Sequence, residues 1–244
     1  MGGYRHGSTL AVTIAVAALT SACSTAAGTP SPTRTSAPIP AAAPTAAPTA
    51  APTAAFPTLN GQTSLNGRYT VGSGLQSHLT VMVPAGWSAS SDWVVLGPKG
   101  NQPPGGMAIR FYTVSNAFKD PRSIGAGVFS PSVGPTAADL AAAIVGDPAW
   151  GATEAADMTI DSLPAKHLQF AIPALGADGT FDMFGDAGNV DRFGFAVGQS
   201  FDLYIVDVSG ERVVVDAFHY PGTSASDLAA QQAVLASIQI NRTP

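Results

Sequence analysis

After residue 57, the side chains best suited to acid or base chemistry are those of His78, His167 and His219. His219 stands out because Asp216 precedes it on the same apolar segment, and hydrolases pair an imidazole with a carboxylate to activate a nucleophile. A spacing of three residues, however, places the two side chains on opposite faces of a strand. Neither a Gly-x-Ser-x-Gly elbow nor a cysteine follows residue 57. We therefore expect no catalytic residues, and a secreted hydrolase around His219 is the least favoured alternative.

The aspartates are the next candidates, because carboxylates can bind a hard cation. Four of them lie among glycines in one stretch: Asp178, Asp182, Asp186 and Asp191. Their spacing lacks the Asp-x-Asp-x-Asp-Gly pattern with a distal glutamate that is typical of calcium loops. We expect no metal and no cofactor. Asp216 is different, because it is predicted to lie opposite Leu203 on an apolar strand face, where a buried carboxylate needs a donor. Asp216 and His219 are therefore candidate ligand-facing residues.

Five phenylalanines alternate with glycines in one stretch of the chain. They are Phe181, Phe184, Phe193, Phe195 and Phe201. Packing in the core is the ordinary interpretation of such residues. The alternative is an apolar-ligand or lipid carrier that uses segment 181–201, with Phe193 and Phe195 facing the ligand.

Cys23 is the only cysteine of the chain, and it follows a basic start and an apolar stretch, residues 10–19, too short to span a bilayer. Residues 19–23, Leu-Thr-Ser-Ala-Cys, resemble the lipobox of bacterial lipoproteins, although Thr20 stands where the family has a large aliphatic residue. The resemblance implies a signal peptide over residues 1–22, cleavage after Ala22, and palmitate-type acylation of Cys23. We accordingly expect an extracytoplasmic protein, lipid-anchored to the cell membrane.

Composition separates the remainder into a tether and one domain. Residues 23–57 consist mainly of Ala, Pro, Thr and Ser, and such a tract lacks the apolar side chains needed to offset the entropy of ordering. We expect a disordered tether there, and a single globular domain over residues 58–244. The domain holds sixteen acidic but only nine basic residues, without a basic cluster, so nucleic acid is not an expected partner.

The domain is rich in short β-like segments, with amphipathic helices predicted after Thr136 and Ser224. The clearest element is a hairpin over residues 201–220 with its turn at residues 209–210, which pairs Asp207 with Arg212. We expect these two side chains to form an exposed ion pair. Both faces of the hairpin are apolar and must be covered. The predicted fold class is α+β, an antiparallel sheet covered by helices on both faces (an α/β/α sandwich).

Several of these segments resemble a known family. Residues 83–87, residues 116–121, the helix start at 135–140, and residues 202–221 with the last helix are similar to uncharacterised actinobacterial cell-envelope lipoproteins of the mycobacterial LpqN type. The resemblance covers most of residues 79–240 and implies a PsbP-like sandwich. It implies no activity, and the cysteine pair common in such proteins is missing. We therefore expect a non-enzymatic binding or interaction module whose partner is an envelope protein or a lipid ligand.

Overall fold

The computed structural model describes residues 55–72, 75, 78–186 and 189–241. All of them fall within one compact unit that begins at Pro52. Ala22, Cys23 and the tether up to residue 54 lie outside the described residues. In the part of the chain that is described, no helix has the length and apolar character needed to cross a membrane.

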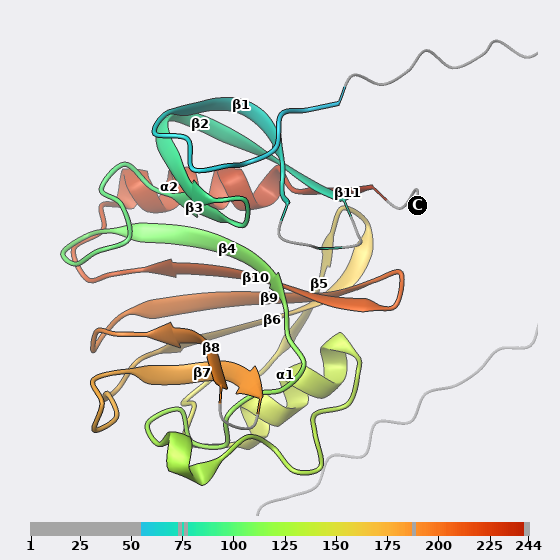
Figure 1. Cartoon of the computed structure of the whole chain (residues 1–244), viewed down its shortest axis with the longest axis vertical. Coiled ribbons are helices and arrows are strands. Elements are labelled where there is room, and N and C mark those ends of the chain that lie inside the picture. The colour runs from blue at the N-terminus through green and yellow to red at the C-terminus, as the bar shows by residue number, and fades with distance from the viewer. Residues whose placement is uncertain (1–54, 73–74, 76–77, 187–188, 242–244) are drawn as a thin grey trace, which may run out of the picture. The chain divides into compact units, whose positions relative to one another are not determined.

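The described residues form a large antiparallel sheet of nine strands in the order β1-β2-β3-β4-β10-β9-β6-β5, with β11 also paired to β2 (Figure 1). Its strands are β1 (Leu65–Thr70), β2 (His78–Ser91), β3 (Val94–Leu96), β4 (Met107–Thr113), β5 (Ala156–Ile160), β6 (Leu163–Ala171), β9 (Ser200–Val208), β10 (Glu211–His219) and β11 (Gln239–Asn241). A separate hairpin joins β7 (Phe181–Asp186) to β8 (Asn189–Gly194). The helical elements are α1 (Ala137–Gly146), α2 (Ala225–Ala236) and a short 3-10 turn, η1 (Ile124–Ala126).

The predicted β9–β10 hairpin is confirmed. Ser209 and Gly210 form its turn with φ of 51° and 86°, and the register places Leu203 opposite Asp216. Positive φ at both positions suits a two-residue turn, because its twist matches that of the flanking strands. The two faces of the hairpin enter two different hydrophobic clusters, as the alternation of apolar residues predicts.

The predicted α/β/α sandwich is wrong, because the described residues form mostly antiparallel sheet and contain only two short α-helices. The 14-residue strand β2 runs on through Pro84 and Gly86, although proline and glycine are typical of turns. Gly86 adopts φ of 87°, a conformation that favours glycine. One face of the sheet is covered by β1, β2 and β11 together with α2. The other face is covered by α1 together with the β7–β8 hairpin and loops.

Both helices begin where the sequence predicts. Thr136 and Asp139 form a capping box at the start of α1, and the Ser224 side chain caps α2. Gln231 of α2 is buried, and its amide donates to the carbonyls of Ala108 at 3.1 Å and Phe218 at 3.0 Å. These bonds fix α2 against β4 and β10, the neighbouring strands that carry the candidate site.

Candidate functional site

A buried ion pair occupies the middle of the sheet. Arg110 of β4 lies directly opposite Asp216 of β10, on the face that also carries Ala108, Tyr112 and Phe218. The Asp216 side chain is 0% exposed and that of Arg110 is 12% exposed. Isolated charges are costly to bury, so the two groups require each other.

The hydrogen bonds of this pair leave some atoms unsatisfied. One Asp216 oxygen, Oδ2, accepts from Nη2 of Arg110 and from the Tyr112 hydroxyl, the latter at 2.9 Å. The other oxygen, Oδ1, and Nε of Arg110 are buried with no hydrogen-bond partner among the described residues. Buried polar atoms are nearly always paired, so atoms of this kind point to water or a ligand.

The electrostatics follow from burial. Desolvation raises the pKa of Asp216, and it is opposed by the charge of Arg110 and the Tyr112 hydrogen bond. Desolvation is also the main cause that raises the pKa of Tyr112, and the Asp216 charge adds to it. Burial acts to lower the pKa of Arg110, but Asp216, Tyr112 and Tyr220 together raise that pKa. Tyr112 therefore remains a neutral donor and Arg110 a cation at physiological pH.

Aromatic rings surround the two arginines of this region. The Arg192 guanidinium of β8 lies 4.2 Å from the ring centre of Trp93 and 4.4 Å from that of Tyr112. The Arg110 guanidinium lies 4.9 Å from the ring centre of Phe218. Its Nη1 donates to the Phe193 carbonyl at 3.4 Å, which connects β8 to the central strands. Cation–π contacts of this kind hold the guanidinium groups in place.

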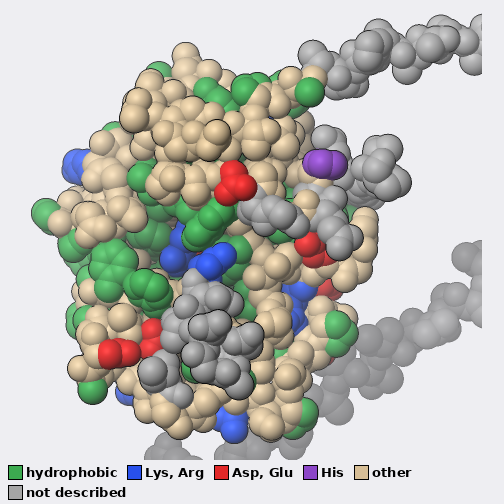
Figure 2. Space-filling view, viewed as in Figure 1, with side chains coloured by type: hydrophobic (Ala, Val, Ile, Leu, Met, Phe, Trp, Pro, Cys, Tyr) green, Lys and Arg blue, Asp and Glu red, His purple; other side chains and the backbone are tan. Residues whose placement is uncertain are grey.

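A pocket of about 330 Å³, which we call the arginine–aromatic pocket, opens over this arrangement. Its lining residues are Ser90, Ser91, Trp93, Val94, Asn101, Ala108, Arg110, Arg192, Phe193, Phe195 and Phe218. Figure 2 shows Lys or Arg side chains beside hydrophobic ones near the middle of the face in view. Phe193 is 41% exposed, an unusual position for a large apolar side chain. The pocket thus combines a cationic floor with aromatic walls.

Two more unsatisfied polar atoms belong to residues that contact Phe195. The Tyr220 ring packs on Phe195 with ring centres 5.8 Å apart, and its buried hydroxyl has no partner among the described residues. Burial raises the pKa of Tyr220, against the opposing charge of Arg110. Gln199 accepts from the Phe195 amide at 3.1 Å, while its own buried Nε2 is also without a partner there. Unsatisfied polar atoms therefore concentrate around this pocket.

The residues predicted to face a ligand are distributed over different places. Phe193 and Phe195 line the pocket, whereas Asp216 lies beneath Arg110 and does not line it. The other phenylalanines of the segment, Phe181, Phe184 and Phe201, are core residues. Arg110 and Arg192 were not anticipated from the sequence. The detectable signal was a lone arginine within the otherwise apolar β4 segment, which is the donor that Asp216 requires.

His219 lies on the opposite face of β10, beside a second pocket of about 380 Å³ that Asp202 and Gln169 also line. Burial lowers the pKa of His219, and its buried Nδ1 has no hydrogen-bond partner among the described residues. Instead His167 contacts Asp202, with Nε2 and Oδ1 2.9 Å apart, and stacks on Tyr204. No hydroxyl is hydrogen-bonded to either imidazole within the described chain, so the hydrolase alternative has no support from this geometry.

Within the described ranges, no group of three or more His, Cys, Asp or Glu side chains is placed to hold a metal ion. Asp178 and Asp182 instead make local bonds to Thr180: Asp178 accepts from its backbone N–H at 3.1 Å, and Asp182 from its hydroxyl at 2.9 Å. Asp186 and Asp191 lie where side chains are not described.

The expected exposed pair of Asp207 and Arg212 is wrong, although the two residues are cross-strand neighbours. Arg212 is only 7% exposed. Its guanidinium donates to carbonyl oxygens of the loops beside α1: Val114 at 2.8 and 3.2 Å, Ser115 at 3.1 Å, Thr136 at 3.3 Å, and Gly134. Asp207 accepts from the backbone N–H of Ala137, with oxygens at 2.8 and 3.0 Å. Loops beside α1 therefore supply the acceptors for Arg212, and the first residue of α1 supplies the donor for Asp207.

Comparison with known proteins adds little. No protein-family model matches the chain, and no curated protein sequence matches it either. A crystal structure of a protein from Bacteroides thetaiotaomicron overlaps 72% of this chain and 48% of its own length, with 11% identity and a TM-score of 0.35. This chain therefore spans about half of that protein, and a likeness this weak carries no inference about fold or function.

Proposed function

We propose that this protein is a non-enzymatic binding module of the cell envelope, and that its ligand binds in the arginine–aromatic pocket. The observation that carries the proposal is the Arg110 guanidinium on the pocket floor, whose Nε is buried without a partner among the described residues. An arginine donor requires an acceptor. The walls provided by Phe193, Phe195 and Phe218 require apolar surface.

The proposed ligand is a small amphipathic molecule. Its anionic or other acceptor group would lie toward Arg110, and its apolar part would lie against the phenylalanines. A pocket of about 330 Å³ falls at the lower end of the range for small-molecule sites. The polar residues Ser90, Ser91 and Asn101 on the rim add hydrogen-bonding groups for orientation.

The location remains a proposal from the sequence. Acylation at Cys23 after cleavage behind Ala22 would anchor the protein to the extracytoplasmic face of the membrane, and residues 23–57 would tether the domain to it. In that setting the candidate partners are a membrane lipid or an envelope protein. Intact-mass analysis of the mature protein tests this point, because acylation of Cys23 adds the mass of the lipid chains.

The second candidate function is a carrier of fully apolar ligands. It is favoured by the exposure of Phe193 and by the three phenylalanines of the pocket lining. The two candidates differ in the role of Arg110. An apolar ligand gains nothing from a guanidinium, whereas an acceptor-bearing ligand loses a charge-assisted hydrogen bond when that group is removed.

A matched pair of fluorescent probes separates the candidates. Anilinonaphthalene sulfonate and N-phenylnaphthylamine share the same ring system, but only the first carries an anion. They would be titrated into the chain with Cys23→Ser and into the same chain with Arg110→Met and Asp216→Leu together, which removes the ion pair without leaving one charge buried. We expect the anionic probe to bind at least about tenfold more weakly to the double variant.

The neutral probe should bind both proteins with similar affinity. Equal affinity of the anionic probe for both proteins would contradict the amphipathic ligand, and selective binding of the neutral probe would favour the apolar carrier. Phe193→Ser should weaken both probes. Arg122→Met provides a control, because Arg122 is exposed and pairs with Asp120 away from the pocket.

A further inference from the structure

The two ends of the large sheet differ in how their outer edges are covered. The edge of β1 is extended by the preceding chain: the Leu59 N–H donates to the Thr70 carbonyl and the Thr70 N–H to the Pro57 carbonyl, both at 2.9 Å. At the other end, β5 pairs with β6 alone, and no described residue pairs with its outer side. Only Ile160 among the five residues of β5 is buried. Uncovered edges are sites where another strand can pair.

The register of the β5–β6 hairpin identifies the backbone groups that face outward. Asp161 and Ser162 form its two-residue turn, with φ of 45° and 67°, and Ile160 lies opposite Leu163. Residues that flank such a turn exchange hydrogen bonds, and the bonded pairs then alternate along the strands. Thr159 is therefore at a position not bonded to β6, consistent with Pro164 opposite it, which has no N–H.

Asp157 lies two residues before Thr159 on the same strand, so it is also at a position not hydrogen-bonded to β6. The backbone N–H and C=O groups of both residues consequently point away from the sheet. They lie about 7 Å apart along the strand. This is the spacing at which an extended polypeptide presents its own donors and acceptors.

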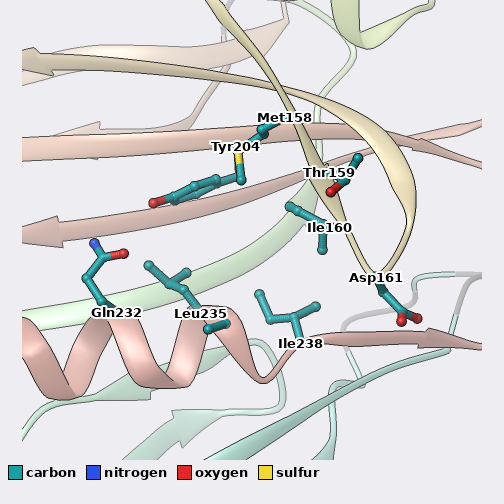
Figure 3. Close-up of a pocket in the computed structure, with 9 residues that line it drawn as sticks. Met158, Thr159, Ile160, Asp161, Tyr204, Gln232, Leu235 and Ile238 are labelled. Atoms are coloured by element: carbon teal, nitrogen blue, oxygen red, sulfur yellow. The ribbon is translucent and has the colours of Figure 1, made fainter.

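An apolar pocket of about 200 Å³ lies beside this edge, between β5 and α2. Met158, Ile160, Tyr204, Leu235 and Ile238 provide its apolar lining. Figure 3 shows side chains of β5 and α2 on opposite sides of the gap, with Asp161 at the hairpin tip. The pocket is on the face of β5 to which Met158 and Ile160 point.

The edge is also held in place. Asp161 Oδ2 accepts the backbone N–H of Ile240 at 2.7 Å, which ties the tip of the β5–β6 hairpin to β11. A rigid edge loses less conformational entropy when a partner binds, so a fixed edge is favourable for docking.

We infer that β5 is a docking edge for an extended peptide of a partner protein. The peptide backbone pairs with Asp157 and Thr159, and one of its apolar side chains enters the pocket between β5 and α2. Backbone pairing provides affinity and the pocket provides sequence preference. A basic residue next to the apolar one would point to the other face of β5. There the Asp157 carboxylate is 86% exposed and pairs with Lys166, and a carboxylate can accept from more than one cation. Glu154, which is exposed just before the strand, adds a second negative charge.

Other occupants fit less well. A small apolar molecule would fill the pocket but leave the outward backbone groups of β5 unused. A second copy of this chain, paired through β5, gains no new charge partner there, because Asp157 already pairs with Lys166 of its own chain. The docking edge lies on the opposite sheet face from the arginine–aromatic pocket, so this inference does not depend on the proposed function.

The test uses a labelled six-residue peptide of alternating lysine and leucine, titrated by fluorescence anisotropy into the full chain with Cys23→Ser. The control peptide has the same sequence but carries N-methyl groups on alternate amides, so that it keeps the side chains and loses backbone donors. We expect saturable binding of the first peptide and at least about tenfold weaker binding of the second. No saturable binding up to about 1 mM, or equal binding of both peptides, would overturn the inference.

Substitutions in the protein test the same edge. Thr159→Pro removes the outward N–H and leaves the β5–β6 bonds intact, since proline is tolerated on edge strands in this orientation. We expect it to weaken the unmethylated peptide at least about tenfold, while Thr159→Ala, which keeps the N–H, changes binding less than about threefold. Ala236→Trp should also weaken binding by filling the pocket, with Ala236→Ser as its matched control. Unchanged binding by Thr159→Pro would overturn the inference.

If Thr159→Pro does not fold, hydrogen exchange of the unsubstituted protein tests whether a peptide pairs with β5. Saturating peptide should slow exchange of the Asp157 and Thr159 amides at least about tenfold, because an incoming strand accepts from both. Unchanged exchange at both amides would overturn the proposal. So would self-association of the chain that Thr159→Pro abolishes, since the edge would then bind a second copy.

Discussion

Arg212 is buried and Arg110 is largely buried, and the two lie on adjacent strands, yet their surroundings differ. Arg212 donates to four backbone carbonyls, and no carboxylate of the described residues forms an ion pair with it. Arg110 has a carboxylate partner in Asp216, and its Nε has no acceptor among the described residues. Arg212 fixes loops against the sheet, while Arg110 lies on the floor of a pocket.

The comparison separates two uses of a buried guanidinium. Where every donor is directed at the chain's own carbonyls, the group stabilises the fold. Where a donor remains unpaired beside a cavity with aromatic walls, the group is available to a ligand. Substitutions should therefore affect mainly stability at Arg212, and mainly binding at Arg110 once its partner charge is removed as well.

The largest effect is expected for Arg212→Met. It removes the donors for the carbonyls of Val114, Ser115, Gly134 and Thr136, and leaves them buried or partly buried. We expect a loss of about 4 kcal/mol in the free energy of unfolding, measured by urea denaturation. A loss below about 1 kcal/mol would show that water replaces the guanidinium as donor, and that Arg212 does not have the stabilising role that distinguishes it from Arg110.

Asp216→Asn is expected to cost about 3 kcal/mol, because it leaves the Arg110 cation buried without its counter-charge. The paired substitution of Arg110→Met with Asp216→Leu should restore most of that loss. Replacement of a buried ion pair by apolar residues is often neutral. Urea denaturation of the single and double variants gives the free energies of unfolding to compare. A double variant less stable than Asp216→Asn would mean that the ion pair is a net stabiliser of the fold.

Asp207→Ala has a smaller expected effect, since it removes only the acceptor for the Ala137 N–H at the start of α1. Loss of one such helix-terminus bond costs about 1 kcal/mol. Thermal unfolding measures it, with the exposed Glu154→Ala as a control. If Asp207→Ala matched Arg212→Met in cost, the two residues would act as an ion pair after all.

The smallest effect concerns pH. Burial lowers the pKa of His219, so below its ordinary value of about 6.5 the unfolded chain binds a proton more readily than the folded one. Stability from this residue is lost as the pH falls through about 6.5 toward the folded-state pKa. His219→Gln should therefore flatten the decline of the unfolding midpoint between about pH 7 and pH 5. A steeper decline in His219→Gln would reverse the assigned sign.

The parts of the fold that could be predicted are those encoded locally. The β9–β10 register follows from a two-residue turn and strict alternation, and both helix starts follow from their capping residues. The fold class could not be predicted, because the continuation of β2 through Pro84 depends on its pairing with β1. Apolar alternation shows that a sheet face is covered, but not what covers it.

The candidate site shows the same limit. The sequence indicated that Asp216 needs a donor, but Arg110 comes from β4, more than 100 residues earlier, and only the β4–β10 pairing brings the two together. The exposed pair of Asp207 and Arg212 was predicted from strand register alone. Strand register does not reveal loops. Here the loops beside α1 cover Arg212, while Asp207 stays exposed and accepts from the first residue of α1.

The buried amide of Gln231 makes the two faces of the sheet mechanically dependent on each other. Ala108 and Phe218 direct their side chains into the arginine–aromatic pocket, and the carbonyls of the same two residues accept from Gln231 of α2. The next residue of that helix, Gln232, lines the pocket beside β5. Any displacement of α2 must therefore break one of these hydrogen bonds or carry the floor of the other pocket with it.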